Sequence, residues 1–370
     1  MKKLKKIFAC LLLVLPGLSA ISQESWAGLE HLFTPVEQYV VYRTEAPLQI
    51  DGIADEPAWK QSSWSADFRD IEDDKKPQPL FRTRVKMLWD EDNLYVYAEL
   101  EEPHIWAYYT DHDQIVYHEN DFEVFVDPDG DGYNYFEFEV NAQNTLFDLF
   151  LPMPYRNGGI PLLSWDAHGF ESAVSLVGTL NDPSDADELW AVEMKVPFSD
   201  MQTGMNRQVP KEGETWKINF SRVHWQTGVV DGTYRKKKDP ATGRDLPEYN
   251  WVWSPPGLIN MHYPERWGML QFSAERVGST PVAFCMPAGG QFRKYVWLVY
   301  YRQQKYKADH GRFASGFEEL DLEGLVNEIE GQSCNLSMLA TDFQFTVQLI
   351  MPDGLELSVN EAGLFRKKQK

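Results

Sequence analysis

Three aspartates close together in the chain are the first residues whose spacing could do chemistry. Asp127, Asp129 and Asp131, followed by Gly132, read D-x-D-x-D-G, the opening of a calcium-binding loop. In a helix–loop–helix calcium site the twelfth position is a bidentate glutamate, but here that position is Phe138. The flanking residues alternate between apolar and polar, which predicts strands. The segment is therefore expected to be a β-hairpin with an acidic tip, either a calcium site at the three aspartates or a plain solvated turn.

The strands of this hairpin carry further side chains that could bind a ligand. Successive side chains of a strand point to opposite faces, so the carboxylates and the amide share the face opposite Phe122 and Val140. Aromatic rings stack on sugar C–H surfaces, and carboxylates and amides accept hydroxyl protons, so rings beside these groups predict a site for a neutral polyol. The alternative is a solvated sheet face with the rings packed under a loop. The candidate residues are Tyr95, Trp106, Tyr117, Glu123, Glu139 and Asn141.

The elements that must position these residues are short strands. Apolar and polar residues alternate from about residue 40 to 275, with glycine- and proline-rich turns between the runs. Helical periodicity is nearly absent there, which favours a mainly β fold, either an antiparallel β-sandwich or a barrel. The predicted strands lie at 83–89, 94–100, 121–127, 135–141, 145–151, 171–177, 189–196, 216–225, 251–253 and 268–273.

The pattern changes after residue 278. A segment of small residues and prolines is followed by helical spacing over 291–309, and then by two strands joined by an Asp-Gly turn. Residues 285–366 are therefore predicted to form a small α+β unit. Cys285 and Cys334 both lie in it, and in an oxidising compartment the pair suggests a disulfide, with two free thiols as the alternative.

The first 22 residues have the composition of a signal peptide. Four lysines precede an apolar run over 7–15 that is too short to span a bilayer, and small residues precede Gln23. We expect cleavage before Gln23 and export to the periplasm or the extracellular space. No later stretch predicts insertion into a membrane.

Charge and composition narrow the class of partner. The net charge of −21 disfavours binding to nucleic acid or to anionic lipid, and suits a neutral ligand or cations. With 13 Trp and 17 Tyr, the chain has rings enough for both a core and a binding surface. No cofactor other than calcium is predicted, and nothing in the sequence indicates an oligomeric state.

A series of segments resembles the carbohydrate-binding module family 9-like proteins. The segments are "IDGIADEPAW", "TRVKMLWDEDNLYVYAELEEP", "ENDFEVFVDPDGDGYNYFEFEVNAQNTLFDL", "LWAVEMKVPF" and "WSPPGLINMHYPERWGMLQF". They follow one another in order across about residues 40–275. The resemblance implies a β-sandwich, which we place at 36–276, and a secreted, non-catalytic protein that binds oligo- or polysaccharides.

The resemblance also implies roles for individual residues. Family members hold sugar chain ends between two aromatic rings. Tyr117 stands where one ring is expected, and Glu123 matches the sugar-binding glutamate. A basic ligand residue of the family would fall on Glu139, which reverses the charge. The second ring would fall near Met261, with His262 or Tyr263 as possible substitutes.

Three functions follow from these observations. The first is carbohydrate binding that serves the breakdown or uptake of polysaccharides, with xylan- or cellulose-type glycans favoured. The second is a glycoside hydrolase, which needs two carboxylates, one with a raised pKa; an open sheet face would not provide the burial for this. The third is a haem-binding relative that uses Met261 and His262, with His104, His112 and His118 as further candidates.

Overall fold

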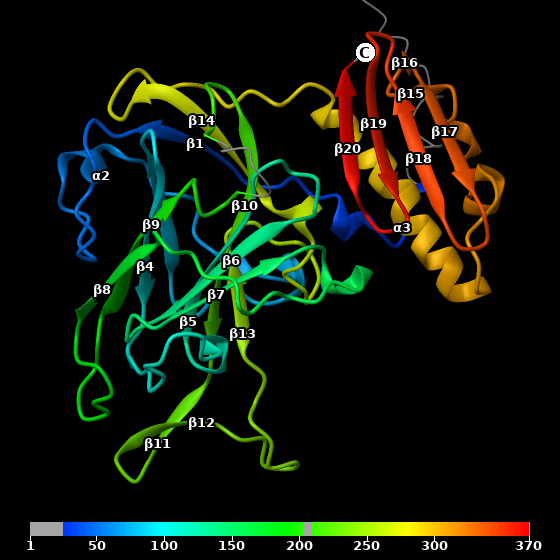
Figure 1. Cartoon of the computed structure of the whole chain (residues 1–370). Coiled ribbons are helices and arrows are strands. Elements are labelled where there is room, and N and C mark those ends of the chain that lie inside the picture. Colours follow the sequence, from blue (N-terminus) through cyan, green and yellow to red (C-terminus); the bar gives the residue numbers. More distant parts are fainter. Residues whose placement is uncertain (1–24, 203–208, 370) are drawn as a thin grey trace, which may run out of the picture.

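The computed structural model describes residues 25–202 and 209–369 (Figure 1). The predicted signal peptide, residues 1–22, lies outside the described residues. Within those residues, no helix has both the length and the apolar character needed to cross a bilayer. The chain forms a large β domain first and a small α+β unit after it, so the predicted fold class is confirmed.

One large curled sheet makes up the β domain. Its strands run in the order β7-β6-β5-β10-β14-β1-β3-β4-β9-β8, and β13 and β2 join it beside β10. A short helix, α2 (Pro57–Gln61), lies outside the sheet, and β11 (Thr227–Val230) and β12 (Thr233–Lys236) form a separate hairpin that projects from the domain (Figure 1). The strands of the sheet are β1 (Gln38–Arg43), β2 (Arg69–Asp70), β3 (Thr83–Trp89), β4 (Asn93–Glu101), β5 (Asp121–Asp127), β6 (Tyr135–Asn141), β7 (Leu146–Leu151), β8 (Glu171–Val177), β9 (Leu189–Pro197), β10 (Thr215–His224), β13 (Tyr249–Val252) and β14 (Gly268–Arg276).

The expectation of a purely antiparallel sheet is corrected at β1. This strand pairs in parallel with β14 on one side and with β3 on the other. β14 lies more than two hundred residues after β1 in the chain, and local periodicity carries no information on a pairing at that separation. The sheet is therefore mixed, and β1 joins its early strands to its last strand.

The two faces of the β5–β6 hairpin enter different environments. Phe122, Val124, Phe136 and Phe138 pack into the main core of the domain. The opposite face holds Phe125 and other residues of a second apolar cluster together with the hairpin's glutamates. Both faces of the hairpin are therefore buried. The alternation of apolar and polar residues predicted burial only for the face with Phe122 and Phe138.

The C-terminal unit packs a helix against a four-stranded antiparallel sheet. Helix α3 (Arg293–His310) lies against β18 (Phe345–Ile350) and β19 (Leu355–Asn360), with β17 (Asn335–Ala340) and β20 (Phe365–Gln369) at the edges. Two short strands, β15 (Glu328–Ile329) and β16 (Gln332–Ser333), form a further hairpin. The apolar core of the unit also takes in Leu32, with Trp26, Leu29 and Phe33 packed against it. The predicted bounds 36–276 and 285–366 remain predictions, but the residues before 36 contact the second unit.

The expected disulfide is not present. Cys285 and Cys334 are both free, Cys285 exposed and Cys334 half-buried. The backbone N–H of Cys285 donates to Gln271 Oε1 at 2.6 Å, which ties this cysteine to β14 of the β domain. Cys334 immediately precedes β17 in the other unit. The two thiols therefore belong to different parts of the fold.

Candidate functional site

A pocket of about 490 Å³ opens over the second face of β5 and β6. Three connections cover this face: the one before β5, the one after β7, and the loop that follows β13. We call it the carboxylate pocket because its lining includes four glutamates and, among the described residues, neither lysine nor arginine. The polar and aromatic side chains that line it include Tyr117, Glu123, Glu137, Glu139, Tyr155 and His262.

Strand pairing brings the glutamates of this pocket together. Glu123 lies directly opposite Glu139, and Phe125 lies opposite Glu137, in the register of β5 and β6. All three glutamates are buried, with exposed fractions of 6%, 4% and 1% for Glu123, Glu137 and Glu139. The expectation of a solvated, open face is therefore wrong. The covering loops come from distant parts of the chain, so strand alternation could not predict them.

Burial raises the pKa of every carboxyl group in this cluster. It raises the pKa of Glu123 to about 7 and those of Glu137, Glu139 and the neighbouring Asp121 well above their usual range. The second cause for Glu137, Glu139 and Asp121 is the negative charge of Glu123. A hydrogen bond from Ser221 acts in the opposite direction on Glu123. Ionising these groups together is therefore costly, and either a bound proton or a bound cation would relieve the repulsion between them.

Two tyrosine rings stand beside these carboxylates. Tyr117 and Tyr155 both line the pocket, and their exposed fractions of 41% and 42% leave part of each residue open to a ligand. Burial, followed by the charges of Glu137 and Glu139, raises the pKa of both phenols. The hydroxyls of Tyr117 and Tyr155 therefore both interact electrostatically with Glu137 and Glu139. Sequence reasoning found Tyr117 but missed Tyr155, whose only signal was an aromatic residue in the proline-flanked loop after β7.

His262 supports the Tyr155 side of the pocket. Its Nδ1 lies 2.9 Å from the hydroxyl of Tyr135, and its ring makes an edge contact with Tyr155 at a centroid distance of 4.4 Å. Burial lowers the pKa of His262 to about 3, so the ring is neutral near pH 7. A neutral imidazole has one donor and one acceptor nitrogen, which suits a sugar hydroxyl. Met261 also lines the pocket but is 8% exposed and belongs to the apolar cluster beneath it, so it offers no stacking surface.

Three other predicted binding residues lie away from this pocket. Asn141 is fully buried. Its side-chain Nδ2 donates to Tyr109 O, and its Oδ1 accepts the backbone N–H groups of Gln143 and Thr145, which stabilises the turn after β6. Trp106 is 4% exposed and packs against Tyr108.

Tyr95 belongs to a separate apolar cluster around Trp59, where its hydroxyl donates to Asp90 at 2.6 Å. The prediction had grouped it with the hairpin because β4 comes just before β5 in the chain. In the sheet, four strands separate β4 from β5. Tyr263, which follows His262 in the chain, does not provide the second sugar-stacking ring, because it packs against the core of the C-terminal unit.

The acidic tip of the hairpin has hydrogen bonds that stabilise its turn. The two carboxylate oxygens of Asp127 accept the N–H groups of Gly130 and Gly132, each at 2.9 Å. Asp131 likewise accepts the N–H of Tyr133. Asp127 is fully buried and lies near the cations of Lys217 and Arg293. These contacts account for the three aspartates as turn residues, and calcium binding by Asp127, Asp129 and Asp131 stays untested.

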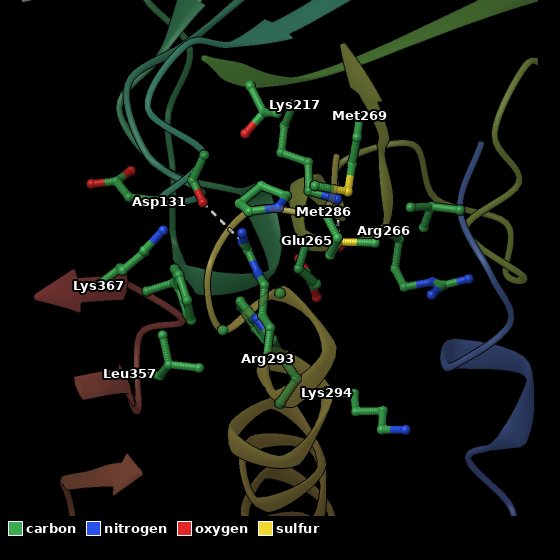
Figure 2. Close-up of a pocket in the computed structure, with 18 of the residues that line it drawn as sticks. Asp131, Lys217, Glu265, Arg266, Met269, Met286, Arg293, Lys294, Leu357 and Lys367 are labelled. Atoms are coloured by element: carbon green, nitrogen blue, oxygen red, sulfur yellow. Dashed lines mark hydrogen bonds between the residues drawn. The ribbon is translucent and has the colours of Figure 1, made fainter. Parts of the chain in front are cut away.

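A larger cavity of about 910 Å³ lies between the β domain and the C-terminal unit. We call it the junction cavity (Figure 2). Its buried cations are engaged by backbone oxygens: Lys217 Nζ donates to Trp267 O at 2.7 Å, Arg266 donates to Thr34 O at 2.9 Å, and Arg293 donates to Gly130 O at 2.8 Å. The last of these bonds joins α3 of the C-terminal unit to the β5–β6 hairpin of the β domain. None of the predicted sugar-binding residues lines this cavity.

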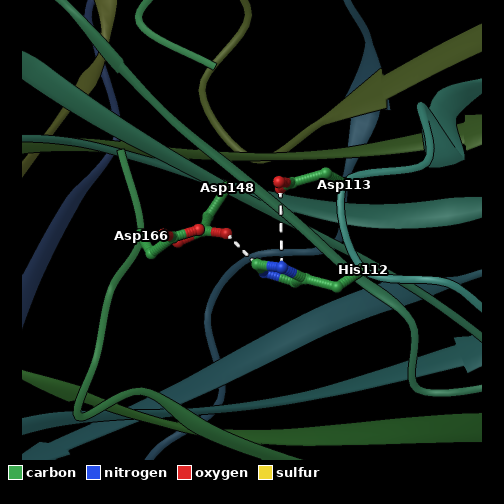
Figure 3. Close-up of side chains that lie close together, drawn as sticks. All are labelled: His112, Asp113, Asp148 and Asp166. Carbon is green, nitrogen blue, oxygen red and sulfur yellow. Dashed lines mark hydrogen bonds and ion pairs between the residues drawn. The ribbon is translucent and has the colours of Figure 1, made fainter. Parts of the chain in front are cut away.

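Besides the pocket glutamates and the acidic tip, a third group of possible metal ligands consists of His112, Asp113, Asp148 and Asp166 (Figure 3). His112 Nε2 lies 3.0 Å from Asp148 Oδ1, and the other oxygen of Asp148 accepts the N–H of Ala167 at 2.7 Å. Asp148 thereby fixes the long connection between β7 and β8. His104 instead pairs with the hydroxyl of Tyr234, and His118 packs against Tyr117, so the histidines named as haem candidates do not converge with His262.

Comparison with known proteins identifies the segment that holds most of this site. Residues 50–153 match the family described as "Carbohydrate family 9 binding domain-like". This range contains Tyr117 and the three central glutamates, whereas Tyr155 and His262 lie outside it. No curated protein matches the chain significantly.

Solved structures with a similar backbone include three chains whose descriptions refer to carbohydrate binding. A proposed carbohydrate-binding protein from Bacteroides uniformis is 18% identical, with a TM-score of 0.47 over 65% of this chain and 100% of its own. A carbohydrate binding module family 9 protein from Caldicellulosiruptor kristjanssonii, in complex with cellotriose, is 15% identical, with a TM-score of 0.41 over 66% of this chain and 100% of its own. A module of the same family and organism, in complex with glucose, is 16% identical, with a TM-score of 0.40 over 66% of this chain and 100% of its own.

Proposed function

Because residues 50–153 match the family described as "Carbohydrate family 9 binding domain-like", we propose that the protein is a non-catalytic carbohydrate-binding protein whose ligand occupies the carboxylate pocket. One observation carries this proposal: two partly exposed tyrosine rings stand beside three buried glutamates in a single pocket. Rings bind the C–H faces of a sugar, and carboxylates receive its hydroxyl protons.

Tyr155 takes the role of the second ring in this proposal. The resemblance placed that ring near Met261, which is apolar but not aromatic. Tyr155 reaches the same pocket from the loop after β7 and is held against His262. A pair of rings from two separate loops would grip one sugar unit from both sides, with Glu123 and Glu139 at the floor.

The compartment and the ligand class are also part of the proposal. The lysine-rich start and the short apolar run support export to the periplasm or the extracellular space, where the protein would serve the breakdown or uptake of polysaccharide. A pocket of about 490 Å³ has room for one or two sugar units, which favours short oligosaccharides or the ends of chains.

Binding calorimetry on the full chain tests the proposal. Cellotriose, xylotriose and glucose are the probes, and Tyr117→Ala and Tyr155→Ala are the variants. Each variant should weaken binding about tenfold, since a lost stacking ring costs roughly 1.5 kcal/mol. Phe343→Ala is the matched control, because Phe343 is 77% exposed in the C-terminal unit, away from the pocket. Equal loss in the control, or no loss in either tyrosine variant, would place the ligand elsewhere.

The raised carboxyl pKa values favour a glycoside hydrolase as the second candidate function. A hydrolase needs one carboxyl group that stays protonated near neutral pH beside one that is ionised, and burial moves Glu123 and Glu139 in that direction. The sheet face that carries Glu123 and Glu139 is buried rather than open, so it provides the burial that a hydrolase needs. Incubation with cellotriose and xylotriose, followed by product chromatography, decides between them: release of shorter sugars that is lost in Glu139→Gln would establish hydrolysis.

A further inference from the structure

Asp121, Glu123, Glu137 and Glu139, the carboxylate cluster, have less compensation than the buried acids Glu102, Glu265 and Glu193. Glu102 is paired with Arg222 at 2.9 Å, and Glu265 with Arg156 at 2.8 Å. Glu193 has no cation but accepts three N–H groups, from Asp51, Gly52 and Trp59. These acids show how the protein normally stabilises a buried carboxylate, namely with a cation or with several donors.

Among the described residues, no cation pairs with Asp121, Glu137 or Glu139, and none of the three accepts several backbone N–H groups. The side-chain hydrogen bonds of Asp121 and Glu137 are to Glu139, within the cluster itself. Asp121 Oδ1 accepts one N–H, from Val223 at 3.3 Å. Its other oxygen, Oδ2, is buried without a hydrogen-bond partner among the described residues, as are Glu137 Oε2 and Glu139 Oε2. Asp121 and Glu139 are at most 1% exposed. An uncompensated buried charge costs several kcal/mol, so these carboxyl groups are neutralised either by protons or by a positively charged occupant.

The geometry of the cluster fits a metal ion. Asp121, Glu123 and Glu139 each offer a carboxylate oxygen, and these oxygens lie within 4.8 Å of one another. Two oxygens bound to one calcium ion at about 2.3–2.6 Å can be at most about 5 Å apart, so the spacing is compatible with one shared ion after a small adjustment of the side chains. The three residues stand on adjacent strands, Asp121 and Glu123 on β5 and Glu139 opposite Glu123 on β6, so the paired backbones hold them in place.

We propose that Asp121, Glu123 and Glu139 bind a hard divalent cation of the calcium type at the floor of the carboxylate pocket. An all-carboxylate ligand set selects hard cations. Calcium suits this set better than magnesium because it accepts irregular geometry and six to eight oxygen ligands. The residues differ from the acidic tip, Asp127, Asp129 and Asp131, whose carboxylates already accept backbone N–H groups.

The cation also explains the reversed charge at Glu139. Where the resemblance implies a basic residue facing the sugar, this chain has a third carboxylate, and a bound cation restores the positive charge at that place. Glu123 and Glu139 line the pocket, so water or ligand hydroxyls in it would complete the coordination of the ion. This last step, in which sugar hydroxyls bind the ion directly, rests on the proposed carbohydrate function.

Calcium titration of the full chain, stripped with EDTA, tests the site itself. Calorimetry at pH 7.5 should show one calcium ion per chain, and calcium should raise the melting temperature. Glu139→Gln and Asp121→Asn should each weaken calcium binding at least tenfold. Without calcium, both variants should melt no lower than the parent, because each replaces a carboxyl group that is costly to ionise in this cluster. Asp129→Asn is the matched control at the acidic tip and should bind calcium like the parent.

Three outcomes would overturn the metal site. They are no calcium binding by the parent, calcium binding that is lost in Asp129→Asn but kept in Glu139→Gln, and binding of glucosamine in EDTA that calcium does not displace. The last would mean that the cluster holds the ammonium group of an amino sugar.

Sugar binding measured with and without calcium separates this inference from the proposed function. The account predicts that EDTA weakens cellotriose binding at least tenfold and that added calcium restores it. Sugar binding that is unchanged by EDTA but lost in Tyr155→Ala would overturn the metal's role and keep the proposed function. Calcium binding lost in Glu139→Gln, with no sugar bound by the parent, would keep the metal site and reject the function.

Discussion

Glu123 on β5 lies directly opposite Glu139 on β6, and both side chains are buried. Like charges placed directly across two strands destabilise a sheet. An apolar or an oppositely charged pair at these two positions would make the hairpin more stable. The juxtaposition is therefore a feature of the ligand site rather than of the fold, and it leads to a prediction about pH.

We expect the carboxylate cluster to make the calcium-free protein less stable as pH rises. Burial raises the pKa of Glu123 from 4.5 to about 7, so between these values the folded state binds more protons than the unfolded state. The free energy of unfolding must then fall as pH rises from about 4.5 to about 7, with no further loss from this group above that range.

Glu123→Gln isolates this effect from those of other titrating groups. In EDTA the variant should match the parent at pH 5 and melt higher than it at pH 7.5. Thermal unfolding at the two pH values measures the difference. A difference between variant and parent that is the same at both values would show that Glu123 has an ordinary pKa.

Phe138→Ala should destabilise the β domain strongly. Phe138 is fully buried and stacks on Phe170 at a centroid distance of 5.3 Å. Truncating a large buried aromatic costs about 3–5 kcal/mol of unfolding free energy, because a cavity remains. Denaturant unfolding measures this, with the exposed Phe343→Ala as the control that should change stability little. A cost below about 1 kcal/mol would mean that the core around Phe138 is not packed as described.

A fragment of residues 36–276 should fold without the C-terminal unit. The main core and the second apolar cluster draw all their buried residues from this range, between Tyr39 and Phe272. The fragment loses contacts from outside it, including the hydrogen bond that Tyr301 donates to Glu265. It should therefore be folded by circular dichroism but melt at a lower temperature than the full chain. An insoluble or unfolded fragment would show that the C-terminal unit is part of the same cooperative unit.

Both cysteines of the C-terminal region should titrate as thiols without reduction. Cys285 is exposed and should react with a thiol reagent in the native protein. Cys334 is half-buried, and burial raises its pKa, so it should react more slowly until the protein is denatured. If neither thiol titrates in unreduced, denatured protein, the two residues are disulfide-bonded after all.

Strand positions could be predicted from the sequence because they depend on local alternation. The predicted strands at 121–127, 135–141 and 171–177 agree with β5, β6 and β8, and the helix predicted over 291–309 agrees with α3. Each of these segments shows its period within a few residues. The parallel pairing of β1 with β14 shows the limit, because it joins segments from opposite ends of the domain.

The site was only partly predictable for the same reason. Alternation separated Glu123 and Glu139 from Phe122, but it could not show that distant loops bury them. It also could not show that Tyr155 would join Tyr117 in one pocket, because the two rings come from different loops with no shared pattern. Asn141 and Tyr95 were on plausible faces, but their hydrogen bonds to Tyr109 and Asp90 assign them to the scaffold.

The most direct test of the central claim is a crystal structure of the full chain soaked with cellotriose in the presence of calcium. The account predicts sugar density in the carboxylate pocket, with a ring face against Tyr117 or Tyr155 and hydroxyls directed at Glu123 and Glu139. Sugar density in the junction cavity, or on a surface that includes neither tyrosine, would contradict it.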